Sequence, residues 1–385
     1  MTETAEGKVL RIGYDLFEEV RYLLEEGQPE TLALVPTLDL HIDFLRRQLE
    51  QNEIEFPEVP PKPAGFEFIC CLTHDIDFAG LRRHRFDHTM AGFLVRATLG
   101  SLSRYRRGRI NLQEAVQNWK TAFKVPLILA SRVPDPWQSF RDYLAAESGI
   151  PSTFFILPFQ GGSERVPANE KASFRRASPY AAGELKSDLA QCMTNGCEVA
   201  LHGMDAWSDA DLGKLEKEEI EKVTGRRIPG ARMHWLYFER STPKTLEEAG
   251  FEWDSTLGYN GAVGYRSGTS QVFRLPGTRN LLELPLHIQD TALFYRDRMD
   301  LGPAEAADLC DRLIENARNF GGVLTVNWHD RSLAPERQWG SFYRELLQRL
   351  KESGAWFATA DQAVSWFRQR RSIDLKGVET IPATC

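Results

Sequence analysis

Short apolar runs alternate with longer amphipathic segments along most of the chain. The clearest run is Phe66–Leu72, which ends in the polar sequence Thr73–Asp77. Continuous apolar runs of about four to eight residues are typical of strands buried on both faces of a parallel sheet. Further runs of this kind are Ser152–Leu157, Glu198–Leu201, Pro229–Met233, Phe251–Asp254, Leu281–Leu286 and Gly322–Asn327.

Helical periodicity fills most of the intervals between these runs. Gly196 and Gly225 follow two of the periodic segments directly, as glycine commonly does at the C-terminal end of a helix. Alternation of short strands with helices of about ten residues or more predicts an α/β protein with a parallel sheet. We predict helices with loops in residues 81–125, and helices at Pro179–Asn195, Asp209–Thr224, Thr242–Ala249, Pro303–Asn319 and Ser341–Glu352.

The first 60 residues differ from the rest because they contain helical spacing and no strand-like run. Two helices are predicted at Tyr14–Glu26 and Thr37–Leu49, followed by a stretch with prolines at 57, 60, 61 and 63. Prolines at this density exclude a helix or a central strand and are typical of a domain boundary. We therefore divide the chain into an N-terminal helical extension with its linker (residues 1–60), an α/β domain (61–370) and a C-terminal tail (371–385).

Composition argues against several classes of protein. The 385 residues carry a formal net charge of -7, which makes a nucleic-acid partner a poor expectation. A single basic cluster, at residues 104–109, is more often a solvated helix end than a binding site, although an anionic sugar could use it. No stretch approaches the roughly 20 apolar residues of a membrane span. Glu3, Glu6 and Lys8 interrupt the N-terminus, so we expect no signal peptide and a cytoplasmic protein.

The six cysteines show neither metal-binding spacing nor a paired framework. Cys70 and Cys71 are adjacent, so their side chains should face opposite sides of a strand. We expect reduced, buried thiols.

Polar side chains of one chemical kind follow four of the predicted strands. Carboxylates and imidazoles are the ligands of a catalytic zinc or similar divalent ion, which polarises a carbonyl and activates water. Taken singly, each residue has a plainer role as a helix cap, an ion-pair partner or a core histidine, and only their conjunction favours a metal hydrolase. These residues are His74, Asp75 and Asp77; His202 and Asp205; Arg232 and His234; and Trp328, His329 and Asp330.

The order of these segments resembles the polysaccharide deacetylase superfamily, the NodB-homology domain. Thr73–Asp77 is similar to its first motif, usually Thr-Phe-Asp-Asp, and Ser152–Phe155 to its Ala-Thr-Phe-Phe strand. The resemblance continues at Gly196–Gly203 (Gly-His-Glu-x-x-x-His), Gly230–Arg232 (Arg-x-Pro), Phe251–Thr256 and Leu324–His329, and covers roughly residues 66–365. Tyr259–Gly268 and the N-terminal helices resemble a divergent branch found among bacterial surface-polysaccharide proteins.

This resemblance implies a distorted (β/α)7 barrel and a set of roles. Asp75 would be the general base and His329 the general acid. Arg232 would keep Asp75 ionised, and Asp254 could orient His329. Asp77 and His202 would bind a divalent metal ion, for which we expect zinc.

Three departures from the family pattern raise open questions. The position of the family's second metal-binding histidine is Ala206, and Asp205 could replace that ligand or could cap a helix. His234 and Trp235 stand where the family's Arg-x-Pro-Tyr motif has proline and tyrosine, and His234 is a candidate for an extra role. His74 replaces phenylalanine, and strand alternation should turn it away from the two aspartates.

Candidate substrate contacts come from polar and aromatic residues near these strand ends. They are His74, His234, Tyr265, Arg266 and Trp328, with Trp207, Trp235 and Tyr237 as further aromatic residues that could stack on a sugar or fill the barrel core.

The expected function is removal of an acyl group, most simply acetyl, from an amino sugar or a nucleotide- or lipid-linked precursor of a surface polysaccharide. The alternatives are a non-catalytic carbohydrate-binding barrel that has lost its metal, motivated by Ala206, and a hydrolase of another non-peptide amide. The sequence leaves the sugar, the metal and the oligomeric state open.

Overall fold

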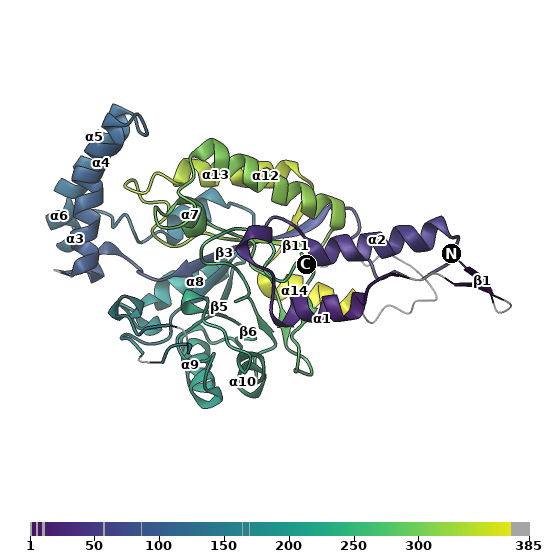
Figure 1. Cartoon of the computed structure of the whole chain (residues 1–385). Helices are drawn as coiled ribbons and strands as arrows, with labels where there is room; N and C mark the ends of the chain where they lie inside the picture. The colour runs from purple at the N-terminus through teal and green to yellow at the C-terminus, as the bar shows by residue number, and fades with distance from the viewer. Residues whose placement is uncertain are drawn as a thin grey trace.

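A computed structural model describes residues 2–4, 7–9, 12–56, 58–85, 87–163, 165–168 and 170–370 (Figure 1). The predicted tail, residues 371–385, lies outside the described residues. At the N-terminus, β1 (Thr2–Thr4) and β2 (Gly7–Val9) form an antiparallel pair.

The centre of the molecule is a parallel sheet closed into a barrel. Along the sheet the strands follow the order β10-β11-β3-β4-β5-β6-β7-β9-β8, and only β8 is antiparallel to its neighbour. They are β3 (Phe68–Ile76), β4 (Thr153–Ile156), β5 (Glu198–Gly203), β6 (Gly230–Met233), β7 (Trp253–Asp254), β8 (Phe273–Arg274), β9 (Leu282–Glu283), β10 (Ile288–Gln289) and β11 (Val323–Asn327).

One segment of chain joins the two ends of this sheet. Residues 282–283 pair with β7, and residues 288–289, only a few positions later, pair with β11. Between them, Leu286 donates its backbone N–H to Leu257 and His287 donates to Thr325. The barrel therefore has seven strand positions, as predicted, with the sixth split into β9 and β10.

Helices cover the outside of the barrel, as the alternating pattern predicts (Figure 1). Four of the five helices predicted after residue 178 are present within a residue of their expected bounds. The fifth, predicted at Pro179–Asn195, begins only at Lys186, after a 3-10 turn at Ala182–Leu185. The covering helices are α7 (Phe140–Ala146), α8 (Lys186–Thr194), α9 (Ala210–Thr224), α10 (Thr242–Glu248), α11 (Asp290–Phe294), α12 (Pro303–Phe320) and α13 (Gly340–Glu352).

Two C-terminal elements were not predicted, β12 (Ala355–Phe357) and α14 (Ala360–Arg370). β12 pairs with the beginning of β3, at Phe68–Cys70. Apolar residues of α14 belong to the same buried cluster as Ile69 and Phe155. The helix therefore closes the end of the barrel at which the parallel strands begin.

Alternation along β3 separates an inner from an outer apolar cluster. Ile69 and Cys71 lie in the inner cluster with Trp253, whereas Cys70 and Leu72 pack outward against the surrounding helices. This confirms that the adjacent cysteines face opposite sides. All five cysteines in the described residues are free and buried.

The N-terminal extension packs along the barrel wall through α1 (Leu16–Glu25) and α2 (Thr37–Gln51). Its backbone pairs with the loop before β8, because Gln28 donates to the carbonyl of Arg266 and Leu38 donates to that of Gly268, each at 2.7 Å. The loop returns one such bond, since the N–H of Tyr265 donates to Ala33.

A second helical unit follows β3 and stands out from one side of the barrel (Figure 1). It consists of α3 (His88–Val95), a π-helical turn (Arg96–Gly100), α4 (Ser101–Arg106), α5 (Leu112–Phe123) and α6 (Val125–Leu129), and it has a small apolar core of its own. Among the described residues, no helix is long and apolar enough to cross a membrane.

Candidate metal centre and catalytic site

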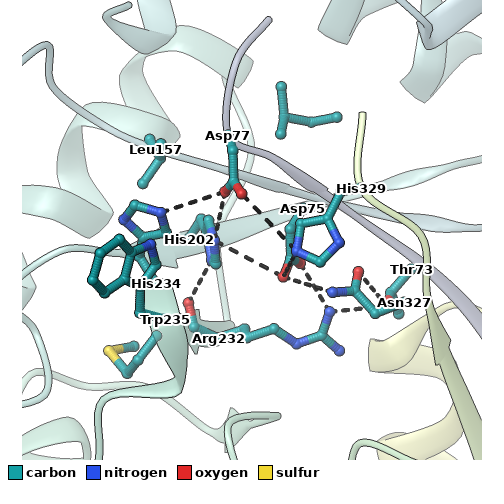
Figure 2. Close-up of polar contacts among 12 residues, drawn as sticks. Thr73, Asp75, Asp77, Leu157, His202, Arg232, His234, Trp235, Asn327 and His329 are labelled. Atoms are coloured by element: carbon teal, nitrogen blue, oxygen red, sulfur yellow. Dashed lines mark hydrogen bonds and ion pairs between the residues drawn. The ribbon is translucent and has the colours of Figure 1, made fainter. Parts of the chain in front are cut away.

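The predicted polar residues meet at the end of the barrel where the strands finish (Figure 2). Asp75 has the same parity on β3 as the inward-facing Ile69 and Cys71, and Asp77 follows two positions later. His202 comes from β5, and Arg232 and His234 come from the end of β6. His329 follows β11, the neighbour of β3 on its other side.

Three of these residues form a group that could hold a metal ion, namely Asp77, His202 and His234. The Nε2 atom of His202 lies 3.3 Å from Oδ1 of Asp77, and Nε2 of His234 lies 3.5 Å from the same oxygen. All the potential ligand atoms lie within 4.8 Å of one another.

The contacts of Nδ1 in His202 and His234 show that Nε2 is the nitrogen available to a metal ion in each ring. Nδ1 of His202 lies 3.0 Å from the backbone carbonyl of Arg232. A carbonyl can only accept, so Nδ1 carries a hydrogen, and in the neutral form of the ring it is Nε2 that presents a lone pair toward Asp77. In His234, Nδ1 contacts the sulfur of Met204 at 3.3 Å, which leaves Nε2 of that ring facing Asp77 as well.

The chemistry of this group fits a divalent cation. Oδ1 of Asp77 is buried and has no hydrogen-bond donor. Burial raises the pKa of Asp77, but His202, His234 and His329 more than offset this, so the pKa is lowered and the residue is a carboxylate. Burial lowers the pKa of His234 to about 3, which makes it a neutral ligand. Lone pairs that converge in this way repel one another unless a cation lies among them.

His234 reaches the group because the chain turns sharply after β6. Trp235 and Leu236 both have left-handed backbones, with φ of 66° and 56°. Two consecutive non-glycine residues in this region carry strain, which is commonly found at functional sites. Asn260 supports the turn by donating to the carbonyl of Trp235 at 3.0 Å.

Asp75 lies beside the metal-binding group and is held as an ionised carboxylate. Arg232 donates to its Oδ1 at 2.9 Å, and Asn327 donates to its Oδ2 at 2.8 Å. Burial raises the pKa of Asp75, but Arg232, followed by His202 and His329, more than offsets burial and lowers it. The predicted role of Arg232 agrees with this geometry.

Arg232 is itself fixed in the barrel wall. The side chain is fully buried, donates to the carbonyl and the hydroxyl of Ser255, and has its guanidinium 4.2 Å from the ring centroid of Phe155. Its charge is therefore held in one position toward Asp75.

His329 faces both aspartates from the opposite side of the site. Its Nε2 lies 4.0 Å from Oδ2 of Asp75 and 3.9 Å from Oδ2 of Asp77, and its Nδ1 lies 2.6 Å from Oδ1 of Asp290. Burial lowers the pKa of His329, but Asp290, with Asp77 and Asp75, more than compensates and raises it to about 10. The ring is therefore an imidazolium that can donate a proton from Nε2.

The partner of His329 corrects the prediction for Asp254. Asp254 instead accepts from the hydroxyl of Thr256 at 2.6 Å and is buried beside Glu283. Asp290 takes the orienting role because β10 ends directly before it and next to β11. Asp290 contacts His329 twice, because its Oδ2 also accepts from the backbone N–H of His329, at 2.8 Å.

Asp205 is not in the group that could hold a metal. Its backbone N–H donates to Glu216 of α9 at 2.7 Å, and its carboxylate interacts with Arg176. Ala206 is fully buried, and a Cβ added at Gly213 of α9 would come within 3.3 Å of its side chain. A histidine has no room there, and His234 is the third potential metal ligand instead.

Two predicted substrate contacts lie behind the barrel wall. His74 points outward, with Nδ1 3.0 Å from the carbonyl of Trp328 and Nε2 3.0 Å from Glu147. Trp328 is fully buried and stacks on Phe342. Both belong to the packing between barrel and helices, because strand alternation turns them away from the aspartates.

Tyr265 and Arg266 belong to the loop against which the N-terminal extension packs. The ring of Tyr265 is buried against His287, and the guanidinium of Arg266 donates to the carbonyl of Gly258 at 3.0 Å. Among the other aromatic residues, Trp207 and Tyr237 are buried against each other. Trp235 is partly exposed and adjoins His234 (Figure 2), which leaves it able to contact a sugar.

Two further residues of the site were not predicted, Asn327 and Asp290. Asn327 is the last residue of β11 and shares its inward parity with Val323, so strand alternation could have identified it. Asp290 could have been found only by recognising that residues 281–289 extend to β11, a pairing that the sequence does not reveal.

Structures of deacetylases are similar to this one. A protein described as a polysaccharide deacetylase from Mycobacterium smegmatis is 20% identical, with a TM-score of 0.48, over 82% of this chain and 96% of that one. Peptidoglycan deacetylase PdaC from Bacillus subtilis is 12% identical (TM-score 0.35; 82% and 98% covered), and so is polysaccharide deacetylase Bc1974 from Bacillus cereus (0.36; 76% and 91%).

Comparison with protein-family models gave no match, and neither did comparison with curated proteins.

Proposed function

We propose that this protein is a metal-dependent hydrolase that removes an acyl group, in the simplest case N-acetyl, from a carbohydrate precursor of a surface polysaccharide. The observation that carries the proposal is that three potential metal ligands, Asp77, His202 and His234, lie beside an ionised Asp75 and a protonated His329. The sequence resemblance to deacetylases is consistent with this chemistry.

Asp77, His202 and His234 would hold the ion, for which two nitrogen ligands and one oxygen ligand favour zinc. When bound, such an ion polarises the acyl carbonyl and makes the attacking water more acidic. Two partly exposed side chains, those of Asp77 and His329 at 16% and 13%, give a substrate access to the site.

Asp75 would accept the proton of the attacking water as general base. Its lowered pKa keeps it ionised at neutral pH. Arg232 and Asn327 hold its two oxygens in place, so that no reorganisation is needed when the proton moves.

His329 would donate a proton from Nε2 to the departing amine. Asp290 fixes the ring by accepting from Nδ1 and stabilises its charged form. The base and the acid thus come from neighbouring strands, β3 and β11, and approach the substrate from one side of the metal ligands.

The alternative of a non-catalytic binding protein was motivated by Ala206. His234 offers a ligand in place of the expected histidine, so this alternative has no specific support. The choice of N-acetyl as the acyl group, the role in surface-polysaccharide synthesis and a cytoplasmic site of action are parts of the proposal that rest on the sequence alone.

Release of acetate from N-acetylated chitooligosaccharides tests the function. We expect turnover by the zinc-loaded protein and a loss of about 10²-fold or more in kcat for Asp75→Asn, in line with removal of a general base. Asp211→Asn, at an exposed position of α9, is the matched control and should keep full activity. Equal turnover by Asp75→Asn and the control would overturn the assignment of the base.

A further inference from the structure

Residues 88–132, the basic lobe, differ in charge from the rest of the molecule. They contain eight Lys and Arg residues against one acidic residue, Glu114, a formal charge of +7, whereas the whole chain has -7. The lobe comprises α3 to α6, which stand out from the barrel (Figure 1). A charge reversal of this size, confined to one unit, indicates an anionic partner.

Most of these cations are free to meet such a partner. Six of the eight are exposed to solvent, and Glu114 is engaged in capping α5. Within the described residues, the exposed cations form a single ion pair, between Arg109 and Asp300 at 3.8 Å. The six exposed residues are Arg106, Arg107, Arg109, Lys120, Lys124 and Arg132.

The same lobe also exposes large apolar side chains. Phe123 is 83% exposed, Leu99 69%, and Val95 and Leu112 55% each. These side chains are additional to the lobe's own core, in which residues such as Phe93 are already buried. Apolar area left in water on this scale marks an interaction surface.

Helical spacing gathers these side chains into two adjoining stripes. Val95 and Leu99 are four residues apart on the helix formed by α3 and the π-helical turn. Leu112, Val116, Trp119, Phe123 and Leu127 follow helical spacing on α5 and α6. The indole N–H of Trp119 donates to the carbonyl of Thr98 at 3.2 Å, which holds the two stripes side by side.

We propose that the basic lobe binds the surface of an anionic lipid bilayer. Interleaved apolar and basic residues on short helices are the composition of a segment that lies in the membrane interface, where apolar side chains enter the acyl region and cations meet lipid phosphates. Lys120 and Lys124 flank Phe123 in this manner. The lobe does not span the bilayer, in agreement with the lengths of its helices.

Two other partners explain the surface less well. A second copy of the chain in a twofold dimer would bring two identical +7 surfaces together, which costs electrostatic free energy. A nucleic acid would use the cations but would leave the exposed leucine and phenylalanine side chains without a role.

Membrane binding would also fix the position of the barrel relative to the bilayer. In the chain, the lobe follows the end of β3 at which Asp75 and Asp77 lie. Arg104 of α4 also donates to the carbonyl of Glu336, in the loop after His329, at 2.7 Å. The site would therefore face substrates held near the membrane, such as a lipid-linked sugar. This consequence, unlike membrane binding itself, rests on the proposed function.

Co-sedimentation of the full-length protein with vesicles tests the proposal. We expect binding to an equal mixture of phosphatidylcholine and phosphatidylglycerol, weaker binding to phosphatidylcholine alone, and loss of binding at high salt. Phe123→Asp and the double variant Lys120→Glu, Lys124→Glu should each weaken binding by on the order of tenfold or more. Circular dichroism would verify that the variants are folded.

Phe17→Asp is the matched control, because Phe17 is 84% exposed but lies on α1, away from the lobe. It should bind vesicles as the unaltered protein does. Absence of binding to the mixed vesicles would overturn the proposal, and so would equal losses in Phe17→Asp and Phe123→Asp. A dimer in sedimentation velocity that dissociates in Phe123→Asp would assign the surface to a second copy. None of these results depends on deacetylase activity, so the two proposals fail separately.

Discussion

Hydrogen bonds to single atoms decide what each residue of the site can do. Nδ1 of His202 contacts the backbone carbonyl of Arg232, whereas Nδ1 of His329 contacts the carboxylate of Asp290. A neutral carbonyl leaves the first imidazole free to act as a ligand, whereas a carboxylate stabilises the second as a charged acid.

Replacing Asp290 by asparagine should therefore impair the acid without removing the metal ligands. We expect kcat to fall by about 10²-fold or more, because the amide cannot stabilise a charged His329. Asp254→Asn is the matched comparison, since Asp254 is equally buried but contacts Thr256 instead. Measurement of kcat for both variants compares the two aspartates. A larger fall in kcat for Asp254→Asn than for Asp290→Asn would contradict the assignment of Asp290 as the residue that orients His329.

At this scale the sequence predicted well the residues whose side-chain direction follows strand alternation. Asp75 and Asp77 face inward by parity on β3, and His202 follows the same logic on β5. His234 and Asp290 depend on backbone that leaves regular structure, a left-handed turn in one case and a split strand in the other. No local pattern of residues encodes those geometries, so their roles were missed or left open.

Among the elements, α9 holds the loop that follows β5. Glu216 of α9 accepts the backbone N–H groups of Met204 and Asp205 at 3.0 and 2.7 Å. Met204 in turn contacts His234, so a buried carboxyl on a helix supports the metal-binding group. Burial raises the pKa of Glu216 to about 8 despite these donors.

Stability should therefore depend on pH through Glu216 in a defined direction. Because its folded pKa lies above its unfolded value, its contribution is complete below pH of about 4.5 and is lost as pH rises toward 8. The free energy of unfolding of the unaltered protein, relative to Glu216→Gln, should fall by on the order of 1–3 kcal/mol between pH 5 and pH 8.

Urea unfolding of both proteins at the two pH values measures this difference. The hydrogen bond that glutamine cannot accept costs the same at both values and cancels. If the free energies of unfolding of the two proteins differ by the same amount at pH 5 and pH 8, Glu216 is ionised in the folded protein at both pH values.

The elements themselves were largely predictable. Each of the seven apolar runs contains or overlaps a strand. A strand buried on both faces requires a nearly continuous apolar run, and such short runs are therefore a direct signal of it. α14 was missed although Ala360, Val364 and Phe367 recur at helical spacing. Closure of the barrel was implied only by the resemblance, since pairing between distant strands is not written in local sequence.

At the scale of the whole molecule, the N-terminal extension is held by close backbone contacts. Gly264 has φ of 136°, and a Cβ atom built there would lie 2.0 Å from the carbonyl oxygen of Ala33. Only glycine allows the extension to approach the barrel this closely.

Gly264→Ala should consequently loosen the extension. We expect faster proteolytic cleavage before residue 60 and a lower midpoint of thermal unfolding. Gly277→Ala is the matched control, because it also has a positive φ but open space around the added Cβ. Similar cleavage rates in both variants would mean that strain, and not contact with Ala33, is responsible.

The charge distribution adds a second feature of the whole molecule. The barrel is acidic and carries one basic lobe beside its proposed catalytic face. Positive and negative charge are therefore concentrated on different parts of the molecule. Orientation at an anionic surface follows from such an arrangement without any further contact.

The measurement that tests the central claim most directly is the metal content of the purified protein and three variants, determined by elemental analysis. We predict one divalent ion per chain in the unaltered protein, its loss in Asp77→Ala and His234→Ala, and its retention in Asp205→Ala. An unaltered protein without metal, or loss of the ion in Asp205→Ala but not in His234→Ala, would contradict the metal centre described above.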